Sequence, residues 1–298
     1  MTGASWRSAA VAAWEARGAY RALAGHEVFT LELSPTGEET AEPLLVLHGF
    51  PTSSFDFHLV VDALAEDRRV LLLDMVGFGL SAKPDIAYTF DLHADVVEAF
   101  VADVGVTRLA LLTHDMGDTV GGELLARAAE GRWPVEVTRR VLTNGSIYIE
   151  MAHLSDGQQF LLALPDERLP DTVGIDGATL QAGLTATFSP ASAVDQAELD
   201  AAWELIEHRQ GHLVLPRTIR YIEERRRNER RFTGAIEAHP SPLGVVWGVD
   251  DPIAVVAMAD RVEAAAGAAS LAKLVDVGHY PMLEAPDRFL ASVSAALA

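Results

Sequence analysis

The sequence of 298 residues contains no cysteine, which excludes disulfide bonds, thiolate metal sites and cysteine nucleophiles. Basic residues are also few, because 23 lysines and arginines stand against 43 aspartates and glutamates, giving a formal net charge of −20. Nucleic acids and anionic membranes are bound through clustered basic side chains, so this charge argues against both as partners. The absence of cysteine fits a reducing compartment, and we expect a cytoplasmic protein.

Long apolar runs and metal-ligand patterns are missing as well. No run reaches the roughly 20 residues of a membrane-spanning helix. The alanine-rich start of the chain is interrupted by Arg7, Glu15 and Arg17, so no signal peptide is predicted. The close pair His208 and His212 lacks the intervening glutamate of zinc hydrolases. We therefore expect neither a metal nor any other cofactor.

Hydrophobic residues make up 49% of the chain, enough for a sizeable core, and they form short apolar runs that alternate with helical patterns. This alternation predicts an α/β fold, a mostly parallel sheet with helices on both faces. The predicted strands are residues 28–33, 44–47, 70–73, 109–112, 141–143, 243–247 and 271–277. The predicted helices are residues 5–24, 59–66, 90–104, 120–130, 255–266 and 287–297.

The alternation is interrupted over residues 146–240, before the last two predicted strands. This stretch is loop-like and helical, with helices predicted over residues 195–207 and 217–231. Clefts in open α/β sheets form at the carboxyl ends of the strands, so we expect the insertion to be a helical cap over that edge. Residues 1–145 and 241–298 would then form the core.

The clearest chemical signal is Thr113-His-Asp-Met-Gly117, which follows a predicted buried strand and precedes a helix. It resembles a nucleophile elbow, a sharp turn that projects its central side chain, here Asp115, into the cleft. A carboxylate that attacks a saturated carbon forms an ester that an activated water can hydrolyse, and it needs no base to be nucleophilic. The motif therefore points to epoxides or alkyl halides. The structural alternative is a helix-capping aspartate.

A second motif, His48-Gly-Phe-Pro51, follows the strand predicted over residues 44–47. Gly49 allows the backbone to approach its neighbours closely. The backbone N–H groups of Phe50 and Met116 are then expected to face the oxyanion that forms when water attacks the ester. We expect His48 itself to have a structural role.

The last two predicted strands each end in a residue suited to this chemistry. His279 is the candidate general base, and Asp251, three residues after Gly248, is the candidate acid that orients it. Asp250 remains an alternative to Asp251. The chain order of nucleophile, acid and histidine is the order of the α/β-hydrolases.

Together these motifs resemble the epoxide hydrolase and haloalkane dehalogenase branch of the α/β-hydrolases, and within it the mesoderm-specific-transcript-like group. The matching stretches span nearly the whole chain. Asp74-Met-Val-Gly-Phe-Gly-Leu-Ser81 is shared widely and is expected to be structural. Trp14-Glu-Ala-Arg-Gly18 and Arg225-Arg-Arg-Asn-Glu-Arg-Arg-Phe232 are the stretches that suggest the subgroup. The resemblance implies an α/β-hydrolase fold and a covalent intermediate on Asp115.

The resemblance also bears on the choice between halides and epoxides. Dehalogenases of this type hold the halide with an indole N–H directly after the nucleophile and often with an asparagine in the HGxP loop. This chain has Met116 and Phe50 at those places, and neither side chain donates a hydrogen bond. Epoxide hydrolases carry HGFP, as here, together with cap tyrosines that protonate the epoxide oxygen.

Tyr221 is the best candidate for such a cap tyrosine. The second tyrosine of the family would lie near residue 160, where this chain has none, so Tyr148 or His153 would have to act as the second donor. Trp203, His208 and His212 are further candidates for lining a cap cavity. The arginine-rich segment 225–231 is expected to be a solvated helix face, paired with neighbouring glutamates at positions 223, 224 and 229. The alternative is that this segment binds a substrate carboxylate or an acidic partner.

We therefore predict a hydrolase without a cofactor that converts a small apolar epoxide and water to a diol. A haloalkane dehalogenase with Trp203 as a halide donor is the alternative. A non-catalytic binding protein on a hydrolase fold is a further one, since a fold does not fix a function. Both a monomer and a homo-oligomer are compatible with the sequence.

Overall fold

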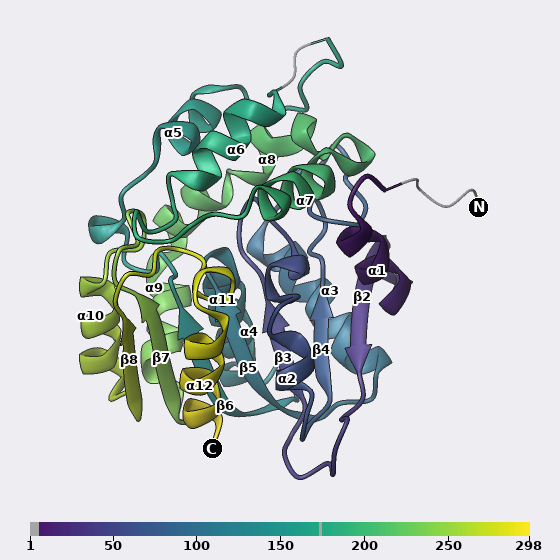
Figure 1. The fold of residues 1–298 in the computed structure, drawn as a ribbon. Coiled ribbons are helices and arrows are strands. Elements are labelled where there is room, and N and C mark those ends of the chain that lie inside the picture. Colours follow the sequence, from purple (N-terminus) through teal and green to yellow (C-terminus); the bar gives the residue numbers. More distant parts are fainter. Residues whose placement is uncertain (1–5, 173–174) are drawn as a thin grey trace.

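A computed structural model describes residues 6–172 and 175–298, and it contains one sheet with helices on both faces and a helical layer above one edge (Figure 1). The strands are Ala19–Leu23 (β1), His26–Leu33 (β2), Leu44–Leu47 (β3), Val70–Leu73 (β4), Arg108–His114 (β5), Glu136–Thr143 (β6), Leu243–Gly248 (β7) and Ser270–Leu274 (β8). Their spatial order is β1-β2-β4-β3-β5-β6-β7-β8. β2 pairs antiparallel with β1 and β4, and the other neighbours are parallel. The predicted α/β architecture is confirmed.

Helices cover the two faces of the sheet and its upper edge. They are Ala9–Arg17 (α1), Val61–Leu64 (α2), Phe90–Asp103 (α3), Met116–Ala129 (α4), Asp156–Ala163 (α5), Gly177–Thr185 (α6), Gln196–Glu207 (α7), Leu215–Thr218 (α8), Tyr221–Ala238 (α9), Ala257–Ala266 (α10), Pro281–Glu284 (α11) and Pro286–Leu297 (α12), with the 3-10 helices Ser54–Phe57 (η1), Ile149–Met151 (η2) and His208–Val214 (η3). In Figure 1, α2, α11 and α12 lie in front of the sheet, and α3, α4, α9 and α10 lie behind it.

The central strands are buried on both faces, which explains their continuous apolar runs. All four residues of β3 are buried. Leu44 and Val46 belong to one core cluster together with Phe289 of α12. Leu45 belongs to the other cluster, with Phe100 of α3. Successive residues of a strand point to opposite faces, so one short apolar run serves both layers.

The predicted insertion lies between β6 and β7, and its described residues form helices and loops but no strand. α5, α6, α7 and α8 lie above the carboxyl ends of the parallel strands (Figure 1). In contrast, α9 packs against α4 in the core, and a Cβ at Gly122 would lie only 2.8 Å from the Phe232 carbonyl oxygen. We therefore propose that the cap ends near the start of α9, rather than at residue 240.

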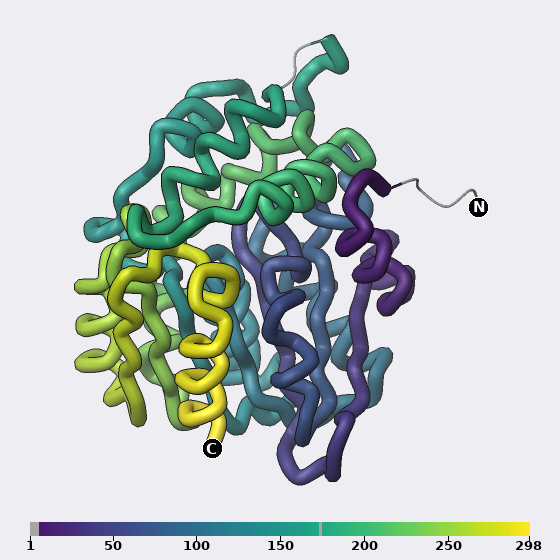
Figure 2. The backbone as a smooth tube through the Cα atoms, viewed as in Figure 1, coloured from purple at the N-terminus to yellow at the C-terminus, as the bar shows by residue number. Residues whose placement is uncertain are grey.

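Hydrogen bonds on two sides of the molecule help to fasten the cap to the core. Near the N-terminus, the Arg7 and Ser8 N–H groups donate to Glu204 of α7, at 2.5 and 2.9 Å. At the other side, the His279 N–H donates to the Thr187 carbonyl at 3.0 Å. Figure 2 shows the backbone after α6 passing over the loop that precedes α11. No helix in the described part of the chain is long and apolar enough to cross a membrane.

The N-terminal region differs from the prediction of one helix over residues 5–24. The helix α1 ends at Arg17, and the next residues form the edge strand β1, paired with β2. Gly18 closes the helix, and Ala24 and Gly25 turn the chain with positive φ angles of 46° and 83°. The helical spacing of apolar residues in the sequence continues past the end of α1, so it does not show where the helix stops. Only the pairing of β1 with β2 shows that the following residues form a strand. The helices α5 and α6 were not predicted.

Candidate active site

Asp115 occupies the junction between β5 and α4. Its φ of 49° and ψ of −113° are strained values for a residue that is not glycine. The turn is held by its N–H, which donates to the Thr143 carbonyl at 3.2 Å. A Cβ at Gly117 would lie 2.5 Å from the Leu47 carbonyl oxygen, so only glycine lets α4 begin this close to β3. The local sequence thus produces the predicted sharp turn.

The loop after β3 lies directly against the Asp115 carboxylate. The Phe50 N–H donates to Asp115 Oδ2 at 2.9 Å. A Cβ at Gly49 would come within 2.7 Å of the same oxygen, which is why this position is glycine. Met116 is the first residue of α4, so its N–H has no acceptor within the helix. The predicted pair of backbone donors therefore borders the carboxylate.

His48 and Asp74, both predicted to be structural, hold the loops around this site. The Met75 N–H donates to His48 Nε2 at 2.9 Å, and His48 Nδ1 lies 2.8 Å from the Gly49 carbonyl oxygen. Burial lowers the pKa of His48, which fits the neutral ring that these two partners require. Asp74 accepts N–H groups of Ser54 and of the turn at residue 80.

His279 and Asp251 form a buried pair at the ends of the last two strands. His279 Nδ1 lies 2.8 Å from Asp251 Oδ2, which leaves the Nε2 atom of His279 for the cavity side. The other carboxylate oxygen of Asp251 accepts the N–H groups of Ile253 and Ala254 at 2.8 and 3.0 Å. Asp250 instead accepts the Ser189 hydroxyl at 2.6 Å, so the geometry favours Asp251 as the partner of His279.

Two residues that support this pair were missed by the sequence analysis. Asn144 follows β6, donates to Asp251 Oδ2 at 2.7 Å, and accepts the Gly248 N–H at 2.9 Å. An asparagine directly after a predicted strand, at the edge where the other site residues lie, was the available signal. The second is Glu284, whose place in the chain carries no such signal, because it follows the candidate base within a short helix.

Glu284 holds the loop of His279. Its Oε2 atom accepts the Gly278 and Ser189 N–H groups at 2.8 and 2.9 Å and the Ser192 hydroxyl at 2.8 Å. Its Oε1 atom accepts the Tyr280 N–H at 3.0 Å. One carboxylate thus joins the residues on both sides of His279 to the cap segment that follows α6.

Three carboxylates determine the protonation of His279. Burial alone would lower the pKa of His279, but the charge and hydrogen bond of Asp251 and the charges of Asp115 and Glu284 raise it to about 9. The neighbouring His114 has its Nε2 atom 2.8 Å from the His279 carbonyl oxygen. Burial lowers the pKa of His114 to about 4. The resting site therefore contains an imidazolium next to the Asp115 carboxylate.

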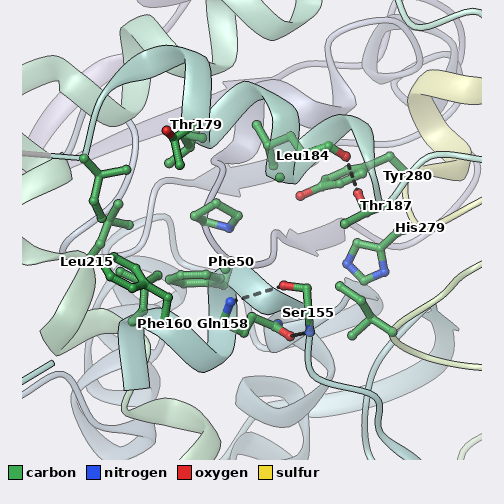
Figure 3. Close-up of a pocket in the computed structure, with 17 residues that line it drawn as sticks. Phe50, Ser155, Gln158, Phe160, Thr179, Leu184, Thr187, Leu215, His279 and Tyr280 are labelled. Atoms are coloured by element: carbon green, nitrogen blue, oxygen red, sulfur yellow. Dashed lines mark hydrogen bonds between the residues drawn. The ribbon is translucent and has the colours of Figure 1, made fainter. Parts of the chain in front are cut away.

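A cavity of about 110 Å³ lies between this site and the cap (Figure 3). Phe50 and His279 line its floor, and Asp115, only 2% exposed, lies beside them beneath the surface of the cavity. The cap contributes mostly apolar side chains, including those of Phe160, Leu161, Ile175, Leu180 and Leu184. The arrangement suits an apolar substrate whose reacting end meets Asp115 and His279.

The comparisons with known proteins agree with this architecture. Residues 44–292 match the alpha/beta hydrolase family. The chain belongs to this family. It is 36% identical over 283 residues to LipZ of Mycobacterium tuberculosis, a protein named as a hydrolase, with 95% of this chain and 96% of the relative covered. It is 31% identical over 297 residues to the mesoderm-specific transcript homolog protein of Bos taurus, covering 95% of this chain and 86% of that protein.

A solved structure shows the same fold. A loop variant of a haloalkane dehalogenase from Bradyrhizobium elkanii superposes with a TM-score of 0.69, covering 94% of this chain and 95% of that one. The two sequences are 21% identical, so this likeness supports the fold alone. The resemblance to the mesoderm-specific-transcript-like group, inferred from the motifs, is confirmed by the relatives.

In this α/β hydrolase, Tyr221 at the start of α9 packs against Phe50 of the loop after β3. The Tyr221 ring is buried, and its centroid lies 5.5 Å from that of Phe50. Burial and the charge of Asp115 raise the pKa of Tyr221, and Arg225 and a hydrogen bond with Gln158 act in the opposite direction. The phenol is therefore protonated at neutral pH. Gln158 lines the main cavity near the position where the family would have a second tyrosine.

The structure does not bring Tyr148 or His153 to the site. The Tyr148 hydroxyl donates to Glu237 at 3.0 Å, and Arg261 covers its ring at 3.9 Å from the centroid. His153 is exposed. The expectation that Tyr148 supplies the second donor is wrong, because its hydroxyl is bound to Glu237. His153 does not line the main cavity. The cavity lining also does not include Trp203, His208 or His212.

The arginine-rich segment is only partly the solvated face that the sequence predicted, because Arg226, Arg227 and Arg230 are exposed and others are not. Arg225 is 3% exposed. Arg231 instead reaches α4, where it pairs with Glu123 at 2.5 Å and with Glu130 at 2.6 Å. Glu229 accepts a backbone N–H of the chain after β6 at 2.7 Å instead of pairing along its own helix. The segment joins α9 to the core, which explains why its charges lie on more than one face.

Among residues 6–172 and 175–298 there is no group of three or more histidine, aspartate or glutamate side chains that could hold a metal ion.

Proposed function

We propose that this α/β hydrolase opens epoxides to diols through a covalent ester on Asp115. The observation that supports this best is the position of the Asp115 carboxylate at a strained strand-to-helix turn. It accepts the Phe50 N–H at 2.9 Å and lies beside the His279–Asp251 pair. A serine at this place would attack acyl carbons, whereas a carboxylate attacks saturated carbons and leaves a hydrolysable ester.

In the first step an Asp115 carboxylate oxygen bonds to one ring carbon of the epoxide. The bond between that carbon and the epoxide oxygen breaks, and the oxygen takes the proton of the Tyr221 hydroxyl. An alkoxide is a poor leaving group, so this proton transfer is what makes ring opening feasible. Gln158, which lines the main cavity, offers amide N–H groups as the second donor to the epoxide oxygen.

In the second step water hydrolyses the ester. His279 takes a proton from the water, whose oxygen attacks the carboxyl carbon of Asp115, and the Phe50 and Met116 N–H groups stabilise the oxyanion. The bond to the alkyl oxygen then breaks, that oxygen is protonated by His279, and the diol leaves. The carboxyl proton left on Asp115 goes to the Tyr221 phenolate, which restores both groups for the next turnover. Alkylation removes the charge of Asp115, one of the groups that raise the pKa of His279, so the imidazolium of the resting enzyme becomes a base once the ester exists.

The site offers less to a halide leaving group. The Met116 side chain is fully buried and has no N–H to donate, and Trp203 packs against Gly177 away from the cavity lining. A haloalkane dehalogenase therefore remains the second candidate. A non-catalytic binding protein would not require the strained turn, the backbone donors and the oriented His279 together.

The test is intact-protein mass spectrometry of His279→Ala incubated separately with epoxides and with haloalkanes. Without the base, attack proceeds but the ester accumulates. An epoxide adds its whole mass, whereas a haloalkane adds its mass less that of the hydrogen halide, so the two reactions give different increments. In the same background, Tyr221→Phe should slow epoxide adduct formation by about 100-fold or more.

The matched control is Asp115→Asn combined with His279→Ala, which should form no adduct with either panel. Peptide mapping of the epoxide adduct to Asp115 supports the proposal. Adducts only from haloalkanes would replace it with dehalogenation. A folded His279→Ala protein that forms no adduct with either panel would overturn alkylation of Asp115 as the mechanism.

A further inference from the structure

A buried guanidinium lies behind the cap tyrosine with part of its hydrogen-bonding capacity unused. Arg225 is 3% exposed, and its Nη1 atom donates to the Ser146 carbonyl at 2.8 Å. Its Nε and Nη2 atoms are buried and have no partner within the described residues. No carboxylate of residues 6–172 or 175–298 lies within ion-pair distance of it. Its guanidinium carbon lies 5.0 Å from the centroid of the Tyr221 ring. Burying a charge without a carboxylate partner is costly, so this arrangement calls for an explanation.

The two unused nitrogens are the pair that binds carboxylates side-on. In a guanidinium, the Nε–H and one Nη2–H bond point in parallel and match the two oxygens of a carboxylate. The remaining nitrogen of the guanidinium, Nη1, already donates to the backbone carbonyl of Ser146. The side chain is therefore fixed with its carboxylate-binding edge free.

Arg225 lines a small cavity of about 20 Å³, more than the roughly 10–15 Å³ that one water requires. Its lining includes Tyr221, Arg226 and Ser146. The Ser146 hydroxyl is also buried and unpartnered within the described residues, which gives a third donor at the same place. Gln158 and Ile253 line this cavity and the main one, so the two are neighbours on either side of the Gln158 side chain.

The nearest acidic candidate for a structural counter-charge is Asp118 on α4. Burial raises the pKa of Asp118 well above its ordinary value, against hydrogen bonding by Thr113 and the charge of Arg225. Burial thus favours the neutral form of Asp118, and its Oδ1 atom accepts the Thr113 hydroxyl. Among residues 6–172 and 175–298, no carboxylate lies at ion-pair distance from Arg225.

We propose that Arg225 and Ser146 form the carboxylate subsite of the substrate. This inference rests on the proposed function: the substrate is an epoxide that carries a carboxylate group, with its apolar part in the main cavity and its ring at Asp115. The expected purely apolar substrate is thereby refined to one with an anionic end. The binding of that end orients the ring between Asp115 and Tyr221.

The test measures binding first, because binding does not depend on the covalent chemistry. Isothermal titration calorimetry with hexanoate and with hexanamide, at the same pH, compares an anion with its neutral isostere. The wild type is expected to bind hexanoate at least about tenfold more tightly than hexanamide. Arg225→Met should remove this preference, and Ser146→Ala should weaken hexanoate binding by about threefold to tenfold.

Arg230→Met is the matched control, since it removes the same charge from the same helix at a side chain that is 82% exposed. It should keep the preference for hexanoate. Arg225→Lys keeps the charge but loses the fork, and should lose most of the preference. If Arg225→Met does not fold by circular dichroism, Arg225→Lys and Ser146→Ala decide the test. Equal binding of hexanoate and hexanamide by the wild type overturns the proposal.

A second arm links the subsite to the reaction. In His279→Ala, an epoxide with a terminal carboxylate should form its adduct at least about tenfold faster than the matching amide, and Arg225→Lys should remove that difference. Carboxylate binding that depends on Arg225 without any adduct would keep the subsite and reject the proposed reaction. Adducts that form equally fast from acid and amide, in a protein that does not prefer hexanoate, would reject the subsite and keep the reaction.

Discussion

The protonation of His279 depends on a neighbouring residue that changes charge during the proposed reaction. Burial opposes the imidazolium, and the carboxylates of Asp251, Asp115 and Glu284 together bring its pKa to about 9. We predict that Asp115→Asn lowers the pKa of His279 below that of the wild type, because it removes one of these charges. The measurement is a pH titration of the His279 imidazole by NMR, with the signal assigned through its loss in His279→Gln.

The sign of this shift has two consequences. Ester hydrolysis should speed up as the pH rises through a pKa below 9, since the alkylated enzyme resembles Asp115→Asn. The pKa of His279 is about 9 in the folded protein and about 6.5 for a free imidazole. Protonated His279 therefore contributes fully to the free energy of unfolding below about pH 6.5, and this contribution is lost as the pH rises through about 9. An unchanged pKa in Asp115→Asn would show that the two groups do not interact.

Only some of the residues at the site could be predicted from the sequence. Asp115, His279 and Asp251 follow predicted strands within recognisable motifs, and the structure brings them together. Arg225 looked like a member of a solvated run, because a sequence does not show that one arginine of seven residues faces the core. Tyr148 has the right chemistry but a hydroxyl bound to Glu237, and such a partner is visible only in three dimensions.

At the scale of elements, the short helix α11 controls the loop that carries His279. Glu284 at its end accepts N–H groups on both sides of the histidine, from Gly278 and Tyr280, and one from the cap at Ser189. We predict that Glu284→Gln lowers the rate of ester hydrolysis by about 10-fold to 100-fold, because an amide N–H₂ opposes those donors and shifts the loop.

Single-turnover hydrolysis of the ester across the pH range is the measurement for this variant. Its pH midpoint should fall as well, since Glu284 is one of the charges that raise the pKa of His279. Asp287→Asn, which removes an exposed charge from the first turn of α12, is the control and should change neither the rate nor the midpoint. A slower rate with an unchanged midpoint would limit Glu284 to loop stability.

Strands could be predicted where burial on both faces requires a continuous apolar run, as in β3, β4 and β7. The edge strand β1 was not, because its burial pattern is mostly exposed and its pairing with β2 depends on the turn at Gly25. The proposed change of the cap boundary has a related cause. Sequence periodicity identifies α9 as a helix, but its packing against α4, made possible by Gly122, is visible only in three dimensions.

At the scale of the whole molecule, the net charge of −20 makes the carboxylates repel one another. Repulsion among the excess carboxylates destabilises the folded state, and because it acts over long distances, added salt screens it effectively. Ion pairs in direct contact, such as Arg231 with Glu123, are screened much less. The same field repels anions from the surface. A carboxylate subsite in such a protein therefore depends on the local guanidinium of Arg225, not on long-range attraction.

We predict that raising NaCl from about 10 mM to about 200 mM at pH 7.5 increases the Tm by roughly 2–5 °C, because the Debye length falls from about 30 Å to less than 10 Å. The sequence pI is about 4.8, so the same addition at pH 5 should change the Tm little. KCl should act like NaCl if screening is the cause. A Tm that falls with salt at pH 7.5 would show that ion pairs of the surface outweigh the net repulsion, and that the excess of acidic residues is locally compensated.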